Sequence, residues 1–209
     1  MLDRYFRIAI DPPLNGLARL IVKLGARPNH VTWAGFGVGC AGFIALAMHL
    51  YIVALALLCL NRLADGLDGA IARVGKNNHG PSAYGAYLDI VLDMIIYAGY
   101  VFFFAVGHPS TWPYAGGLLF AFMGTCASFL GYAVIAEKNG YETLRNGEKS
   151  FFHAGGLIEG SETFAYLALI CLFPELFKIL TLVFIALCVI TIYGRIHMAR
   201  DHFGHLRDQ

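Results

Sequence analysis

Four aspartates, Asp65, Asp68, Asp89 and Asp93, stand inside otherwise apolar stretches of the sequence. The first two come near the end of one apolar segment, and the last two near the start of the next. An aspartate at the centre of a membrane helix costs roughly 2.5–3.5 kcal/mol on insertion scales, so such residues usually mark functional sites. We therefore expect these carboxylates to carry the chemistry of the protein.

The chemistry expected of these acids is metal-assisted phosphoryl transfer. Carboxylates without histidine or cysteine beside them select hard cations, here Mg²⁺ or Mn²⁺. Two divalent ions would neutralise the negative charge of the four carboxylates. Two such ions about 3.5–4 Å apart clamp a phosphate and stabilise the attacking and leaving oxygens. Gly66, Gly69 and Gly85 would leave room for a phosphorylated ligand, and Arg73 offers a fork for phosphate.

The composition is that of a membrane protein. The chain has 209 residues, 58% hydrophobic and 14% charged, with a mean hydropathy of +0.62, whereas soluble domains carry about 25% charged residues. The formal net charge of +1 argues against a nucleic-acid partner. The five cysteines stand singly and predict neither a disulfide framework nor a metal site. We expect residues 1–209 to form one all-α integral membrane domain, with 1–28 as a juxtamembrane segment without a cleavable signal.

Six apolar segments are long enough to cross a membrane as helices. They run from about Val31 to Leu50, Tyr51 to Val74, Ser82 to Val106, Trp112 to Ala136, Phe151 to Phe173 and Leu176 to His197. Asn29 is expected to cap the first span, and Gly35 and Gly39 at GxxxG spacing predict packing against another helix. The stretch from Pro13 to Gly25 has helical apolar spacing, which suits either a helix in the membrane interface or one packed on protein.

The basic residues indicate the orientation. Thirteen of the fifteen fall before the first span, or in the last turn of the second, fourth or sixth span or in the segment that follows it. The others are Arg62, deeper inside a span, and Lys178. By the positive-inside rule both termini and the 74–82 loop face the cytoplasm. We expect the membrane to be a bacterial or archaeal inner (cytoplasmic) membrane.

This topology brings the acids together. The second and third spans are antiparallel around a short loop, and at about 1.5 Å rise per residue all four acids lie within roughly 8–17 Å of the cytoplasmic ends. Each pair shares a helix face, at i, i+3 or i, i+4 spacing. With the two helices in register around the loop, Asp65 should face Asp93, and Asp68 should face Asp89. Four carboxylates should then converge on one patch beside the cytoplasm.

These residues resemble the motif of the CDP-alcohol phosphotransferase family, D-x-x-D-G-x-x-A-R followed after a gap by G-x-x-x-D-x-x-x-D. All eight fixed positions are present, as Asp65, Asp68, Gly69, Ala72, Arg73, Gly85, Asp89 and Asp93. The gap of eleven residues from Val74 to Tyr84 is longer than is usual in the family. The resemblance implies the fold as well, since members are six-helix membrane proteins preceded by a juxtamembrane helix.

The resemblance also implies roles. Asp65, Asp68 and Asp89 would hold two divalent metals, and Asp93 would contact one metal and act as general base on the acceptor hydroxyl. The alkoxide would attack the β-phosphorus of a CDP-alcohol lipid donor, commonly CDP-diacylglycerol, and CMP would leave. The residues implied for the CDP site are Gly69, Ala72, Arg73 and Gly85, with Asn29 and Thr32 added from the first span, where capping explains them equally well. Members are often homodimers.

The sequence leaves the acceptor alcohol open. Arg62, one turn before the acids, can pair with an acid or contact a phosphate. Glu159 and Glu162 would suit an amine or polyol acceptor, or cap a helix, whereas Arg145 and Lys149 would suit a phosphate. Two alternatives from other classes are a cation transporter that uses the acids as its ion path and a non-catalytic lipid-binding membrane protein. Off-centre acids without an apparent repeat disfavour the first, and the complete set of four acids disfavours the second.

Overall fold

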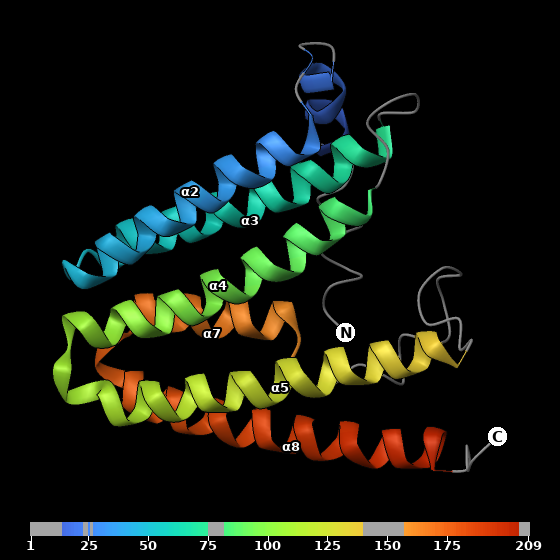
Figure 1. Ribbon diagram of the computed structural model, residues 1–209. Helices are drawn as coiled ribbons and strands as arrows, with labels where there is room; N and C mark the ends of the chain where they lie inside the picture. The colour runs from blue at the N-terminus through green and yellow to red at the C-terminus, as the bar shows by residue number, and fades with distance from the viewer. Residues whose placement is uncertain (1–13, 23–24, 26, 75–81, 140–156, 205–209) are drawn as a thin grey trace. The chain divides into compact units, whose positions relative to one another are not determined.

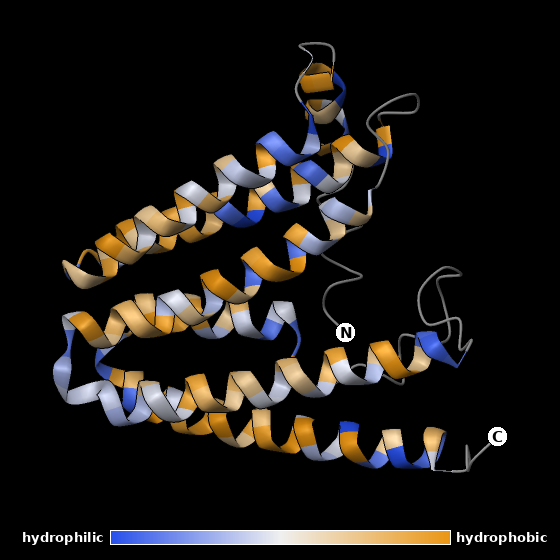
Figure 2. Ribbon diagram, in the orientation of Figure 1, coloured by the Kyte–Doolittle hydropathy of each residue, from blue (hydrophilic) through white to orange (hydrophobic). Residues whose placement is uncertain are grey.

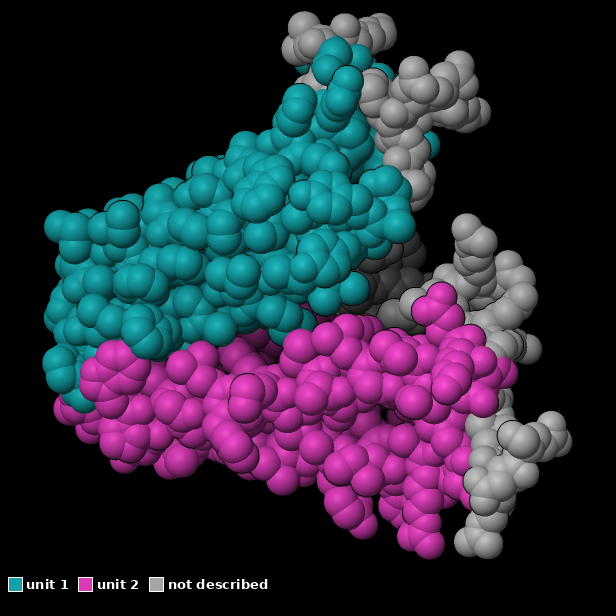
Figure 3. Space-filling model, in the orientation of Figure 1, with its two compact units in different colours: residues 1–109, 167–174 teal, residues 110–166, 175–209 magenta. Residues whose placement is uncertain are grey.

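The computed structural model describes residues 14–22, 25, 27–74, 82–139 and 157–204, and within these ranges every regular element is a helix (Figure 1). The helices fall into two compact units, one made of residues 1–109 and 167–174 and the other of residues 110–166 and 175–209 (Figure 3). All four aspartates belong to the first unit, so the architecture of that unit decides how they are placed.

Three long helices dominate the first unit: α2 (Pro28–Ala47), α3 (Tyr51–Val74) and α4 (Ala83–Gly107). Helix α2 packs along both α3 and α4. Its glycines permit this close approach, because a Cβ on Gly35 would lie 2.6 Å from the Cβ of Ala64 on α3, and one on Gly39 would lie 2.4 Å from Ile96 Cδ1 on α4. The predicted packing role of Gly35 and Gly39 is therefore confirmed.

The helix starts follow the sequence signals in α3 and α4 but not in α2. Helix α3 begins and ends where predicted, and Ser82 caps α4 by accepting the N–H of Gly85 at 2.9 Å. The prediction that Asn29 caps the first span is wrong, since the cap position is Arg27. Pro28 takes the first helical position because its φ is fixed near the helical value and its missing amide donor has no partner to lose there.

Residues 14–22 form a short helix that packs on α3. Ala18 is fully buried and clusters with Ala70 of α3, whereas Leu17 and Leu20 are exposed. One face of this helix is thus covered by protein, which agrees with the prediction of a helix packed on protein. Contact of its exposed leucines with a membrane interface remains a prediction.

The second unit is built around α5 and α8, which pack against each other. Arg195 of α8 donates to the carbonyl of Thr125 at 2.9 Å, and the Tyr132 hydroxyl lies 2.7 Å from His202 Nδ1. Helix α7 is divided between the two units. In chain order, the elements after α4 are η1 (Pro109–Thr111), α5 (Trp112–Lys138), α7 (Gly160–Leu172), η2 (Pro174–Leu176) and α8 (Phe177–Phe203).

Four of the described helices are long and apolar enough to cross a membrane: α2, α4, α5 with η1, and α8 with η2. The chain is an integral membrane protein. Helix α3 has the necessary length, at 24 residues, but its composition includes Arg62, Asp65, Asp68 and Arg73. Helix α7 has 13 residues, and the start of the predicted fifth span lies outside the described residues. The six-span count therefore remains a prediction.

Polarity within the first unit is distributed along the helices. Figure 2 shows that α2 and α3 are mainly apolar toward the turn that joins them and carry polar residues toward their other ends. The aspartates of α3 lie in this polar half, in the last three turns of the helix. The site thus occupies one end of the α2–α3–α4 packing and not its middle.

Candidate metal centre

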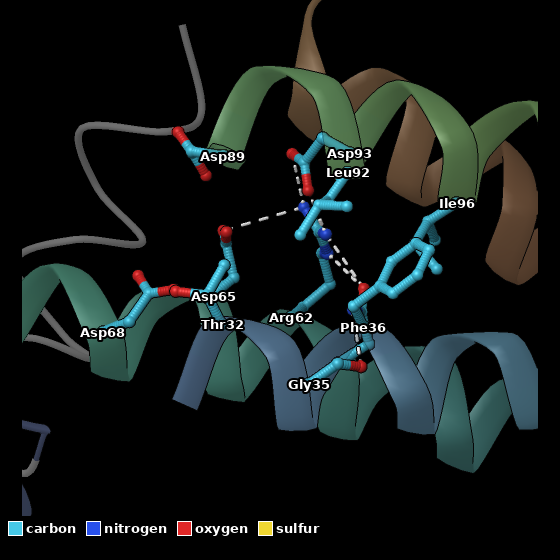
Figure 4. Close-up of a pocket in the computed structure, with 11 residues that line it drawn as sticks. Thr32, Gly35, Phe36, Arg62, Asp65, Asp68, Asp89, Leu92, Asp93 and Ile96 are labelled. Atoms are coloured by element: carbon cyan, nitrogen blue, oxygen red, sulfur yellow. Dashed lines mark hydrogen bonds and ion pairs between the residues drawn. The ribbon is translucent and has the colours of Figure 1, made fainter. Parts of the chain in front are cut away.

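The tightest acidic group among the described residues consists of Asp65 of α3 with Asp89 and Asp93 of α4. Each offers one carboxylate oxygen, and these oxygens lie within 4.8 Å of one another. Opposite ligands of an octahedral Mg²⁺ lie about 4.2 Å apart, because each stands about 2.1 Å from the ion. The 4.8 Å limit on the separation of the three oxygens is slightly above this spacing, and an all-oxygen ligand set fits a hard divalent cation. Figure 4 shows the three side chains reaching from two helices toward a common space.

Asp68 stands apart from this group of three. Thr32 of α2 donates a hydrogen bond to Asp68 Oδ2, and the same hydroxyl lies 3.2 Å from the carbonyl of Pro28. The predicted proximity of Asp65 and Asp93 is confirmed, but Asp68 does not join Asp89 in the tight group. The prediction considered the pairing of α3 with α4 alone. It could not take account of α2, whose Thr32 holds the Asp68 carboxylate by a hydrogen bond (Figure 4).

Arg62 of α3 offsets part of this negative charge. Its Nη1 donates to Asp93 Oδ2 at 2.8 Å, its Nη2 pairs with Asp93 Oδ1, and Nη1 lies 3.6 Å from Asp65 Oδ2. Tyr97 also donates to Asp93 Oδ2, at 3.1 Å. Pairing with acids, one of the two predicted roles of Arg62, is confirmed. The sequence alone assigned no role to Tyr97, although its i+4 spacing from Asp93 on α4 was a usable signal.

The acids open into a pocket with one charged and one apolar wall. Phe36 of α2 and Leu92 and Ile96 of α4 form the apolar side (Figure 4). The complete lining is Thr32, Gly35, Phe36, Asn61, Arg62, Asp65, Asp68, Asp89, Leu92, Asp93 and Ile96. All of these residues come from α2, α3 and α4. The lining thus gathers all four aspartates and a hydrophobic surface around a space of about 10 Å³, which is enough for one water molecule or a small ion.

Residues 26–198, which include every helix that contributes to this pocket, match the family described as CDP-alcohol phosphatidyltransferase. The chain belongs to this family. CDP-alcohol phosphatidyltransferases are transferases of substituted phosphate groups. Membership therefore supports the enzyme interpretation over the cation transporter and the non-catalytic lipid-binding protein.

Individual relatives agree with the family assignment. Inner membrane protein YnjF of Escherichia coli K12 is 41% identical over 197 residues, which cover 94% of each chain. The archaetidylinositol phosphate synthase of Pyrococcus horikoshii is 30% identical over 107 residues, which cover 51% of this chain and 55% of that one. The crystal structure of Mycobacterium tuberculosis phosphatidylinositol phosphate synthase with CDP-DAG bound has a TM-score of 0.66 at 22% identity, covering 90% of this chain and 93% of that one. The last comparison shows a shared fold.

The glycines of the phosphatidyltransferase motif differ in what surrounds them. Gly69, followed on α3 by Ala72 and Arg73, is open, since a Cβ there would approach only the Arg73 guanidinium, at 3.5 Å. Gly66 was predicted to clear the same space for a ligand, and that role remains a prediction. A Cβ on Gly66 would lie 3.1 Å from Leu14 Cδ1, so its small size also serves the packing of the N-terminal helix on α3.

Gly85 brings the start of α4 close to α2. A Cβ on Gly85 would lie 3.1 Å from Ser82 Oγ and 3.5 Å from Asn29 Oδ1. Asn29 is therefore beside a residue of the phosphatidyltransferase motif, although it does not cap α2. Its predicted contact with the nucleotide, like that of Gly85, remains a prediction.

Among the residues predicted for the acceptor, Glu162 has a structural role. Its Oε2 accepts the N–H of Glu159 at 3.1 Å and the hydroxyl of Ser161 at 3.0 Å, an arrangement that matches half of a capping box at the start of α7. The helix-capping alternative is thus confirmed for Glu162. Arg145 and Lys149 lie outside the described residues.

Proposed function

We propose that the protein transfers a phosphatidyl or related phospho-alcohol group from a CDP-alcohol, with CDP-diacylglycerol as donor, to an alcohol acceptor, with release of CMP. The convergence of Asp65, Asp89 and Asp93 within 4.8 Å, in a chain of the CDP-alcohol phosphatidyltransferase family, carries this proposal. The CDP-DAG in the related synthase structure supports the choice of donor.

In this proposal Asp65, Asp68, Asp89 and Asp93 hold two divalent cations, Mg²⁺ or Mn²⁺. When bound, these ions would neutralise the donor diphosphate and stabilise the attacking and leaving oxygens. The crystal structure of the Mycobacterium tuberculosis synthase in complex with manganese and citrate supports a metal requirement. The tight group of three carboxylates supplies the shared ligands, and Asp68 supplies a further carboxylate beside them.

The remaining steps are assigned to side chains and backbone of the chain. Asp93 takes the proton from the acceptor hydroxyl. The acceptor oxygen then bonds to the β-phosphorus while the bond from that phosphorus to the CMP oxygen breaks, so CMP leaves with the bonding electrons. Arg73 binds the donor phosphates, and Gly69 lets them approach the α3 backbone. Ala72, Gly85, Asn29 and Thr32 complete the proposed CDP site.

The acceptor and the membrane setting belong to the same proposal. Arg145, Lys149 and Glu159 are the residues we assign to the acceptor side, whereas Arg62 is held by Asp93. The active site and both termini face the cytoplasm, in agreement with the distribution of basic residues and with an inner-membrane relative. The enzyme works as a homodimer of six-span chains, each opening laterally to admit the donor tails.

The test is CMP release by the purified full-length protein in lipid nanodiscs. The assay combines CDP-diacylglycerol, Mn²⁺ or Mg²⁺, and a panel of acceptors: inositol phosphate, glycerol 3-phosphate, serine and choline. We expect CMP release with one acceptor, lost on chelation of the metal and lost in Asp89→Asn. Absence of metal-dependent CMP release with every acceptor would overturn the proposal.

A further inference from the structure

The guanidinium of Arg62 is held from three directions. Asn61 Oδ1 accepts from its Nε at 3.0 Å and from its Nη2 at 2.9 Å. The Asp93 carboxylate accepts hydrogen bonds from both Nη groups, and the Tyr97 hydroxyl lies 3.1 Å from Nη1. The Arg62 guanidinium also stands 5.4 Å from the centre of the Tyr97 ring. A side chain with this many partners has one position in the site.

Asn61 is itself fixed. It is buried, and its Nδ2 donates to the carbonyl of Gly35 on α2 at 3.0 Å. A chain of hydrogen bonds therefore runs from the α2 backbone through Asn61 and Arg62 of α3 to Asp93 of α4. The chain orients both Asp93 oxygens from one side. Because Oδ2 also accepts from the Tyr97 hydroxyl, Oδ1 is the oxygen that keeps a lone pair for another partner.

Arg62 also changes the charge of the metal centre. Four carboxylates and two divalent cations would balance, so the additional guanidinium leaves the loaded centre with a surplus positive charge before the donor diphosphate arrives. Before loading, the same cation reduces the attraction of the acids for a divalent ion. Its side chain is only 18% exposed, so water screens this effect incompletely.

We propose that Arg62, anchored by Asn61, is a positioning residue for Asp93 that stays on this carboxylate when metal binds, and that it lowers the affinity of the centre for metal while it orients Asp93. Only the orienting role rests on the proposed function, because metal affinity can be measured without any substrate.

The first test is Mn²⁺ binding to the metal-free protein, measured by calorimetry in nanodiscs. Arg62→Gln should bind Mn²⁺ more tightly, by about tenfold or more, since the competing charge is gone. Arg62→Lys keeps the charge and should bind within about threefold of the unchanged protein. The exposed Lys178→Gln, which removes a cation from the other unit, should leave Mn²⁺ affinity unchanged.

The second test separates orientation from charge by kinetics. Lysine presents a point charge in place of a fork, so Arg62→Lys should lower kcat by about tenfold or more while KM for the donor changes by less than about threefold. Tyr97→Phe removes one hydrogen bond to Asp93 and should lower kcat by a smaller factor, with Mn²⁺ affinity close to that of the unchanged protein.

Two results would overturn the inference. One is Mn²⁺ binding in Arg62→Gln that is equal to or weaker than in the unchanged protein, as expected if Arg62 only supports the fold. The other is an unaltered kcat in Arg62→Lys. If the unchanged protein releases no CMP, the proposed function fails, but the calorimetric result still decides the role of Arg62 in metal affinity. If Arg62→Gln does not fold, Arg62→Met, which also removes the charge, replaces it in the calorimetry, and Arg62→Lys and Tyr97→Phe decide the orienting role.

Discussion

Thr32 of α2 donates a hydrogen bond to Asp68 of α3, and this contact ties the first long helix to the acidic cluster. Asn61 makes a second tie, from α3 back to the carbonyl of Gly35 on α2. Three helices therefore hold the site, although its acids come from only two of them. A change in α2 should accordingly disturb the centre without removing any carboxylate.

Replacing Thr32 by valine tests this relationship. Thr32→Val keeps the shape of the side chain but removes the hydroxyl, and Asp68 loses a hydrogen bond worth about 1 kcal/mol net. We expect the Mn²⁺ concentration for half-maximal CMP release to rise by about fivefold, which corresponds to that energy. Thr32→Ser retains a donor and should stay close to the unchanged protein. Equal effects of valine and serine would show that packing of the methyl group matters and the hydrogen bond does not.

The separation of Asp68 from the other acids predicts a graded response to loss of charge. Asp89→Asn removes an anion from the group of three and should weaken Mn²⁺ binding by more than about tenfold, whereas Asp68→Asn should have a smaller effect. Calorimetry on both variants gives the comparison. Asp201→Asn, on the exposed end of α8, is the matched control and should bind as the unchanged protein does. Equal losses at Asp68 and Asp89 would contradict the grading.

The placement of the acids on facing helices could be predicted from the sequence. Asp65 and Asp93 lie in strongly apolar segments whose length and spacing identify helices, and a short connection between two such segments makes them antiparallel. Their proximity follows from the helical rise and period alone. The ends of α3 were predictable for the same reason, since an apolar run ended at Val74.

The contacts made by α2 could not be predicted in this way. The direction of Asp68 and the anchoring of Asn61 depend on how closely α2 approaches, and that distance is set by tertiary packing at Gly35. Gly66 was assigned to ligand access because it stands next to an acid, and the sequence could not show that Leu14 of the N-terminal helix also lies beside it. Spacing along one helix carries no information on which neighbour covers each face.

The different surroundings of Gly66 and Gly69 make a paired test of the donor site. Gly69→Leu would fill open space on α3, and we expect it to raise the KM for CDP-diacylglycerol by about tenfold while Mn²⁺ affinity is retained. Gly66→Ala meets only the flexible tip of Leu14, so its KM should change by less than about threefold. Steady-state CMP release on both variants decides the point. A larger rise in KM for Gly66→Ala than for Gly69→Leu would place the donor beside Gly66 and Leu14 and not beside Gly69.

Gly42 provides a test of the packing that supports the site. A Cβ at this position would lie 2.0 Å from the hydroxyl of Tyr100, which donates to the carbonyl of Ala54 at 2.9 Å inside the α2–α3–α4 packing. Gly42→Ala must either move Tyr100 or break its hydrogen bond, so we expect a loss of about 1–3 kcal/mol in unfolding free energy.

Gly37→Ala, on the same helix, meets no atom within 4 Å and should be neutral or stabilising, because alanine favours helix by up to about 1 kcal/mol over glycine. The thermal midpoints of the two variants in the same detergent give the comparison. A midpoint for Gly42→Ala as high as that for Gly37→Ala would show that α2 does not pack on Tyr100 as closely as described, and would weaken the case that α2 holds the metal centre.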